Sequence, residues 1–446
     1  MNPQSVQHIS ECFVKPQPMP HEANQPFYLT QWDLAMLSVH YIQKGLLFSK
    51  PSPNAFNITN FLDKLKHSLA QTLIYFYPLA GRLVTTKGDD PASYAVYVDC
   101  TNSPGARFVH ASVEMTLSDV LSPTYVPSIV QSFFDHDRAL NHDGHFKSLL
   151  TIQVTDLIDG VFIGCSLNHA IGDGSSFWQF LNSFSEIFRA AEGDDVKISR
   201  PPVLKRWFPD GYGPVINLPF TNPEQFLLHY ESPLLKERMF HFSSASIAKL
   251  KAKANSEHNT NKISSFQSLS ALMWRCITRT RNLPHDQITS CRVACNNRSR
   301  LNPPLPENYF GNCIYPLRAF TIAGELLENN LGWAAWKVHE AVVNHTDEAT
   351  RKNVESWMKS PTIYKIPQLF DSFSVMMGSS PRFNKYGSEF GLGKALALRS
   401  GYAHKFSGKV SAYPGREGGG SMDLEICMPP DLMDALESDP EFMDAL

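Results

Sequence analysis

Apolar residues form two strand-like runs in the first half of the chain, at 149–154 and 161–167. The dipeptide Asp159-Gly160 between them is a strong turn signal, so the pattern predicts a β-hairpin. Directly downstream, apolar residues recur at helical spacing, which predicts a helix over 175–191. The apolar face of that helix consists of Phe177, Leu181, Phe184 and Phe188.

The short polar run NHAIGDG, residues 168–174, joins the predicted hairpin to the predicted helix. It places His169 at a strand end in a tight turn, where loops carry chemistry on rigid supports. A histidine with a near-neutral pKa can take a proton from an alcohol or amine that attacks an activated carbonyl. Asp173 can turn back toward the ring or cap the helix, and the Ser175-Ser176 pair can also cap it.

The rest of the pattern divides the chain into two halves. In the first, leucines at helical spacing predict a helix over 59–75, and mixed strands extend to about residue 168. A stretch rich in glycine and proline follows, which is typical of a connection. In the second half, the pattern predicts a serine-capped helix within 262–275 and a short strand at 291–295. We therefore predict an N-terminal domain at 1–192, a crossover linker at 193–228 and a C-terminal domain at 229–446.

Composition narrows the class of protein. The chain has 446 residues, of which 43% are hydrophobic and 19% charged, with a net charge of −3. Without a basic excess, nucleic-acid binding has little support. The longest apolar stretches are too short to span a membrane, and the N-terminus lacks the basic and apolar regions of a secretory signal. We expect a soluble, cytoplasmic enzyme that binds neither nucleic acid nor membranes.

Two other groups of residues could carry chemistry. Cys165 lies four residues before His169 and could be a nucleophilic thiol, although a cysteine in a strand is usually a packing residue. The chain has no Cys-x-x-Cys pair, and we expect its eight cysteines to be reduced and buried. The segment 135–145 holds three histidines and three aspartates, which could bind zinc or a harder cation. Its spacing is not that of a helical zinc motif, which favours an exposed loop without metal.

Five motifs in order along the chain resemble those of the plant BAHD acyltransferases. His169 and Asp173 match the HxxxD signature of that family. The other four matches are LTQWDL at 29–34, FYPLAGRL at 76–83, RSRLNPP at 298–304 with YFGNC at 309–313, and EFGLG at 389–393 in place of DFGWG. The last motif departs from the family, with Glu389 for aspartate and Leu392 for tryptophan. A carboxylate is kept and an indole packing surface is lost, so we expect activity to persist and local packing to change.

The resemblance implies an α/β fold of two similar chloramphenicol-acetyltransferase-like domains, each a mixed β-sheet with flanking helices, and a channel between them. The acyl donor would enter from one face and the acceptor from the other, with His169 as general base in the middle. Asp173 and Glu389 complete the implied catalytic set, although the Glu389 loop is mainly structural in the family. A monomer with no permanently bound cofactor is implied.

The implied reaction moves an acyl group from coenzyme A to a hydroxyl or amine of a plant specialised metabolite, with acetyl or malonyl favoured and aromatic groups possible. Residues that match family positions near the donor are Ser264, Ser265, Arg298, Arg300, Ser380 and Arg382. Each could instead be a helix cap or a surface residue. Arg298 has a second implied role, as the ion-pair partner of Asp173, and the sequence leaves the two open.

Arg416 lies in a glycine-rich turn before a predicted strand at 422–426. Because the resemblance implies that this strand lies near the acyl group, Arg416 could bind a carboxylate and favour malonyl transfer or an acidic acceptor. It could equally be an exposed residue paired with Glu417.

Two alternatives to transfer remain: a lyase acting on a carboxylated metabolite, and a non-catalytic binding protein. The presence of His169 favours transfer over both.

Overall fold

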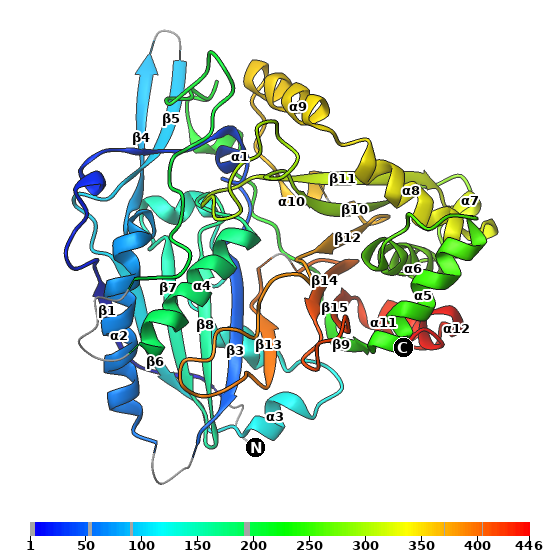
Figure 1. The fold of residues 1–446 in the computed structure, drawn as a ribbon, viewed down its shortest axis with the longest axis horizontal. Coiled ribbons are helices and arrows are strands. Elements are labelled where there is room, and N and C mark those ends of the chain that lie inside the picture. The colour runs from blue at the N-terminus through cyan, green and yellow to red at the C-terminus, as the bar shows by residue number, and fades with distance from the viewer. Residues whose placement is uncertain (1–4, 52–55, 90–91, 191–196, 370, 404) are drawn as a thin grey trace.

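Two mixed six-stranded sheets form the frame of the molecule (Figure 1). The computed structural model describes residues 5–51, 56–89, 92–190, 197–369, 371–403 and 405–446. Residues 191–196, where the end of the predicted helix 175–191 and the start of the predicted linker fall, lie outside these ranges. Two mixed sheets in an α/β protein are the fold class that the resemblance implies, and the structure confirms it.

The first sheet carries the predicted hairpin at its centre. Its strands, in spatial order, are β1 (Gln7–Val14), β6 (Ala106–Ser112), β7 (Leu150–Asp156), β8 (Gly160–Leu167), β3 (Ile42–Ser49) and β13 (Ala397–Ser400). β7 and β8 pair in antiparallel fashion, as predicted, and β8 is buried along its whole length. Burial on both faces explains why β8 is continuously apolar, whereas β7 alternates its apolar residues with Thr151, Gln153 and Thr155, which are also buried.

The second sheet is built from the other half of the chain. Its strands, in spatial order, are β11 (Ile314–Ile322), β10 (Ile288–Asn296), β12 (Val375–Gly378), β14 (Lys409–Pro414), β15 (Met422–Met428) and β9 (Lys236–Phe242). A smaller sheet joins β2 (Phe27–Tyr28), β5 (Ala92–Asp99) and β4 (Arg82–Asp89). The predicted strand at 291–295 thus lies within β10.

Long helices cover the sheets and bury their apolar faces. Over the first sheet lie α2 (Ile58–Tyr75) and α4 (Gly174–Arg189), which agree with the predicted helices at 59–75 and 175–191. Over the second lie α5 (Ser244–Glu257), α6 (Ser265–Thr280) and α8 (Leu331–Val343). The remaining α-helices are α1 (Gln31–Leu34), α3 (Leu117–Leu121), α7 (Ala323–Glu328), α9 (Asp347–Lys359), α10 (Ile366–Leu369), α11 (Pro430–Leu436) and α12 (Pro440–Met443). None of the described helices is long and apolar enough to cross a membrane.

Short 3₁₀ helices complete the connections: His21–Asn24, Tyr77–Ala80, Ser128–Phe133, Asn141–His145 and Pro223–Gln225.

One strand crosses between the halves. β13 comes from the predicted C-terminal domain but pairs with β3 at the edge of the first sheet. The predicted boundaries therefore stay a prediction, and the segment 397–400 belongs to the sheet of the other half.

Candidate active site

A cavity of about 610 Å³ lies between the two sheets. His169, which follows β8, forms part of its wall, as do residues of β3, β10 and β14. Four of the predicted donor residues also line it, namely Ser264, Arg300, Ser380 and Arg382. The structure therefore brings the end of the hairpin and four of the six predicted donor residues to one cavity.

Two asparagines hold His169. The backbone N–H of His169 donates to Asn141 Oδ1 at 2.7 Å, and Asn312 Nδ2 donates to the carbonyl oxygen of His169 at 2.6 Å. Asn312 Nδ2 also donates to Asp33 Oδ1, so the amide oxygen of Asn312 faces the ring and accepts from His169 Nδ1 at 3.1 Å. Because Nδ1 then carries the hydrogen, Nε2 is the basic nitrogen of the neutral ring.

Burial lowers the pKa of His169, although Asp173 and the hydrogen bond that the ring donates to Asn312 act in the opposite direction. The imidazole is therefore neutral at neutral pH. A neutral imidazole with a fixed tautomer can accept a proton, which is the property that a general base needs.

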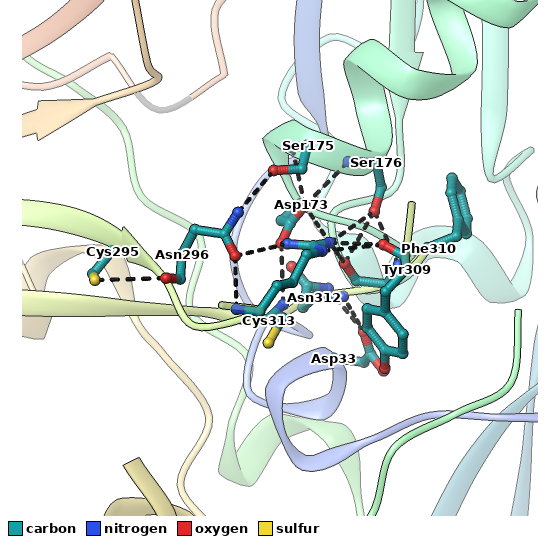
Figure 2. Close-up of polar contacts among 12 residues, drawn as sticks. Asp33, Asp173, Ser175, Ser176, Cys295, Asn296, Tyr309, Phe310, Asn312 and Cys313 are labelled. Carbon is teal, nitrogen blue, oxygen red and sulfur yellow. Dashed lines mark hydrogen bonds and ion pairs between the residues drawn. The ribbon is translucent and has the colours of Figure 1, made fainter. Parts of the chain in front are cut away.

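Asp173 is saturated by donors other than the imidazole. Its side chain caps α4 by accepting from the backbone N–H groups of Ser175 and Ser176, at 3.0 and 3.1 Å (Figure 2). It also accepts two hydrogen bonds from Arg298, at 2.7 and 3.0 Å, and one from the backbone of Cys313. Burial would raise the pKa of Asp173, but Arg298 and these donors outweigh it and hold the pKa below its usual value. The geometry favours a positioning role for Asp173 over a catalytic one.

Arg298 has no hydrogen left for a ligand. Besides Asp173, its guanidinium donates to the carbonyl oxygens of Tyr309 and Gly311, and the residue is only 3% exposed. It lies behind the cavity wall. Of its two implied roles, this placement favours the ion pair that holds the histidine loop, and the assignment to coenzyme A is corrected accordingly.

The structure contains a second buried ion pair, between Asp33 and Arg206, which the sequence pattern did not predict. Asp33 is fully buried and accepts from both the backbone N–H and the side-chain amide of Asn312, each at 3.0 Å (Figure 2). It also closes a capping box with Thr30 at the start of α1. An acid three residues after a threonine inside an apolar run was the available signal. The LTQWDL motif therefore supports the residue that orients His169.

The expectation that 135–145 is an exposed loop is wrong. Asn141 is fully buried and donates to the carbonyl oxygen of Met36 at 2.7 Å while it holds the His169 backbone. His142 contacts the hydroxyl of Tyr94, and His145 that of Thr85. These partners come from β4 and β5, which local sequence could not reveal. Among the residues that the structure describes, no three His, Cys, Asp or Glu side chains are arranged to hold a metal ion.

The predicted donor residues differ in their availability. Ser264 caps α6 together with Gln267 and lines the cavity, whereas Ser265 is the first residue of the helix and lies outside the wall. Arg300 lines the cavity while it donates to two carbonyl oxygens, those of Val342 and His345. Ser380 and Arg382 also line it, and Arg382 is exposed.

The structure does not bring Glu389 to the cavity, so its predicted catalytic role is corrected. Its side chain is 40% exposed and lies 3.9 Å from Arg189 at the end of α4. The next residue, Phe390, is fully buried among the phenylalanines of α4 and β3, and its φ of 47° lies in the left-handed region. The loop anchors itself by packing, which is a structural function.

Two further candidates lie away from the reaction. Arg416 is exposed and its Nε donates to the carbonyl oxygen of Ala395 at 3.0 Å, outside the cavity wall. Cys165 is fully buried in β8, and burial raises the pKa of its thiol. This favours the packing role over a nucleophilic one. All eight cysteines are free, and all but Cys12 are buried.

Comparisons with known proteins identify the family of the chain. The model of the Transferase family matches residues 4–443. An uncharacterised acetyltransferase of Arabidopsis thaliana is 37% identical over 446 residues, which cover 98% of this chain and 99% of the relative. The Arabidopsis BAHD acyltransferase DCR is 32% identical and covers 98% of this chain and 92% of the relative.

Two solved structures share the fold. Vinorine synthase superposes with a TM-score of 0.75 at 20% identity and covers 99% of this chain and 98% of its own. TRI101 of Fusarium sporotrichioides, solved with coenzyme A and T-2, has a TM-score of 0.70 at 16% identity over 94% of this chain and 98% of its own. The chain therefore belongs to the Transferase family and is a BAHD acyltransferase.

Proposed function

We propose that this protein transfers an acyl group, with acetyl or malonyl favoured and aromatic groups possible, from coenzyme A to a hydroxyl or amine of a small plant metabolite. The observation that carries the proposal is His169, a neutral imidazole of fixed tautomer in the wall of a cavity between the two sheets. The acetyltransferase among the relatives supports acetyl as one donor group.

In the proposed reaction His169 Nε2 accepts the proton of the acceptor as its oxygen or nitrogen attacks the thioester carbonyl. The tetrahedral oxyanion collapses and expels the thiolate of coenzyme A, which takes the proton back from the imidazolium. No acyl-enzyme intermediate is needed. Positioning of a general base contributes roughly two to four orders of magnitude, and orientation of two bound substrates adds to this.

Coenzyme A is a co-substrate in this proposal and no cofactor stays bound. Its phosphates would be held by Arg300, Arg382 and Ser380, and by the amino end of α6 at Ser264. Helix amino ends and arginines both favour phosphate oxygens. The binding of coenzyme A by TRI101, which shares this fold, supports the assignment. A cytoplasmic location, a monomeric state and the absence of nucleic-acid or membrane partners stay predictions.

The test is incubation of purified protein with acetyl, malonyl, benzoyl and hydroxycinnamoyl thioesters of coenzyme A and a plant extract. We expect release of free thiol together with new acylated masses by mass spectrometry, and loss of both in His169→Ala. A change in extract metabolites without thioester consumption would favour the lyase alternative. No change with any donor would contradict the proposal.

A further inference from the structure

Four lysines gather in and behind one part of the cavity wall, and we call them the lysine cluster. Lys44 lies on β3 and Lys409 on β14, so the two sheets each contribute one member. Lys405 precedes β14, and Lys385 lies between β12 and β13. Lys44, Lys405 and Lys409 line the cavity, while Lys385 is fully buried behind it. The proposed transfer reaction uses none of them.

Among the residues that the structure describes, one member of the lysine cluster has an ion-pair partner. Lys405 pairs with Glu237. Lys385 donates to neutral oxygens, those of the Ser379 hydroxyl at 2.8 Å and the Ala412 carbonyl at 3.0 Å. Lys44 donates to the hydroxyl of Tyr413 at 2.5 Å.

Lys409 has no protein partner of its own. Within the described chain, no acceptor lies at hydrogen-bonding distance from its Nζ, which rests close to Gly378 at the cavity wall. Burial, with Lys44 as a further cause, lowers the pKa of Lys409 to about 8.

Negative charge near the cluster is insufficient to balance it. The second nearby carboxylate, Glu425, accepts hydrogen bonds from the hydroxyls of Ser400 and Tyr413. The four lysines thus lie beside two carboxylates, Glu237 and Glu425, and burial lowers the pKa of Lys44, Lys385 and Lys409. Asp423, a further carboxylate near Lys385, is paired with His241. Buried ammonium groups without a counter-charge are costly, so packing alone does not account for them. An anion in the cavity would remove that cost.

We propose that the lysine cluster binds a carboxylate carried by one of the two substrates, with Lys409 and Lys44 as its direct contacts. This rests on the proposed acyl transfer and names its substrate class: a dicarboxylic acyl group such as malonyl, or an acidic acceptor. Glu425 lines the same cavity and would repel a multiply charged phosphate more strongly than a single carboxylate. In this proposal the substrate carboxylate binds to these buried lysines rather than to the exposed Arg416.

Equilibrium binding, measured by calorimetry at fixed ionic strength, tests the proposal without requiring turnover. In the donor arm, malonyl-coenzyme A is compared with acetyl-coenzyme A. In the acceptor arm, the protein saturated with coenzyme A is titrated with succinate and with its neutral analogue succinamide. We expect the anionic member to bind more tightly in one arm, which identifies the substrate that carries the carboxylate.

The variants Lys409→Met and Lys44→Met should each reduce that preference by at least roughly tenfold, the loss expected for one hydrogen bond to a charged group. Lys352→Met, an exposed lysine on α9, is the matched control and should keep it. Thermal melting of each variant checks that it is folded, and either lysine variant alone suffices for the test.

The proposal would be overturned if malonyl-coenzyme A bound as tightly as acetyl-coenzyme A and succinate bound as tightly as succinamide. A preference that survives both lysine substitutions would also overturn it, as would inorganic phosphate competing on equal terms with the preferred anionic ligand. Failure of the proposed transfer has a different signature, because a protein that prefers the anionic ligand but releases no thiol would contradict the reaction and leave the carboxylate site intact.

Discussion

Two asparagines and two buried ion pairs support His169, whose imidazole lines the cavity. Asn312 receives its orientation from Asp33, and Asp33 is held by Arg206. The loop that carries His169 is held in parallel by Asp173 and Arg298. Such a supporting shell keeps the ring in its reactive orientation before substrate arrives, so no binding energy is needed to order it.

The variant His169→Ala should lose acyl transfer by roughly two or more orders of magnitude, because it removes the proposed general base. Its melting temperature should change little, since the ring is only partly buried and contributes little to the core. Thiol release and thermal melting measure the two effects. A folded variant with unchanged turnover would contradict the role of His169.

The pH dependence of kcat/KM should show an acidic limb below pH 6.5, the ordinary pKa of histidine. Because burial lowers the pKa of His169, the base stays neutral as pH falls through 6.5, and the rate declines only when the pH passes the lowered pKa. In Asn312→Ala the hydrogen bond that raises this pKa is lost, so the limb should move to still lower pH while the maximal rate falls. A limb centred above pH 6.5 in the unaltered enzyme would contradict this.

The variant Asp173→Asn should lose stability and turnover together. It leaves the guanidinium of Arg298 buried without its counter-charge, which costs about 3–5 kcal/mol when a buried pair is broken. Chemical denaturation measures the loss. Glu307→Gln, which breaks the exposed pair with Arg200, is the control and should melt at an unchanged temperature. An active Asp173→Asn variant of full stability would show that the pair is dispensable.

At the scale of elements, the loop 389–393 holds its place by Phe390 and by a serine of α4, Ser185, which accepts from the backbone N–H groups of Glu389 and Phe390. Leu392 is partly buried against the same core. The tryptophan expected at that position would add packing surface, and the exposed carboxylate of Glu389 contributes little.

Restoring the family sequence with Glu389→Asp and Leu392→Trp should therefore change the melting temperature more than the turnover. The loop lies outside the cavity wall, so it has no direct route to the reacting atoms. Phe390→Ala serves as the contrast and should cost about 3–5 kcal/mol, as for other buried phenylalanines. A large gain in turnover without a change in stability would contradict a structural role.

The spacing of apolar residues predicted the helices and strands whose packing is set by their own sequence. It did not predict the segments whose partners lie far away in the chain. The hairpin β7–β8 and the helices α2 and α4 follow from the spacing of their own apolar residues. The segment 135–145 gives no such signal, because its polar side chains are buried by pairing with β4, β5 and the turn at Met36. For the same reason, the roles of Asp33, Arg206 and Asn312 could not be predicted from the sequence. The role of His169 could be predicted, because the turn that carries it has a local sequence signal.

At the scale of the whole molecule, β13 ties the halves together. Its residues 397–400 pair with Lys44–Leu47 of β3, and Lys44 reaches across to Tyr413 of the second sheet. The cavity has walls from both sheets, so it is complete only in the joined molecule.

A chain split within the predicted linker 193–228 should therefore give an N-terminal half that aggregates when produced alone, because β3 becomes an unpaired edge strand. Production together with the C-terminal half should restore a monodisperse complex and its thiol release. Size-exclusion chromatography and the thioester assay measure both. A stable, monomeric N-terminal half would contradict the structural role of β13.

The position of β13 late in the chain also sets the order of events during synthesis. β3 leaves the ribosome early, but the strand that covers its edge emerges only after most of the protein has been made. Until then the nascent chain carries an open edge, and the cavity lacks the wall supplied by Lys405, Lys409 and Glu425. We therefore expect a product of premature termination before residue 397 to be a target of chaperones and proteases, and not a partial enzyme that sequesters acyl donors.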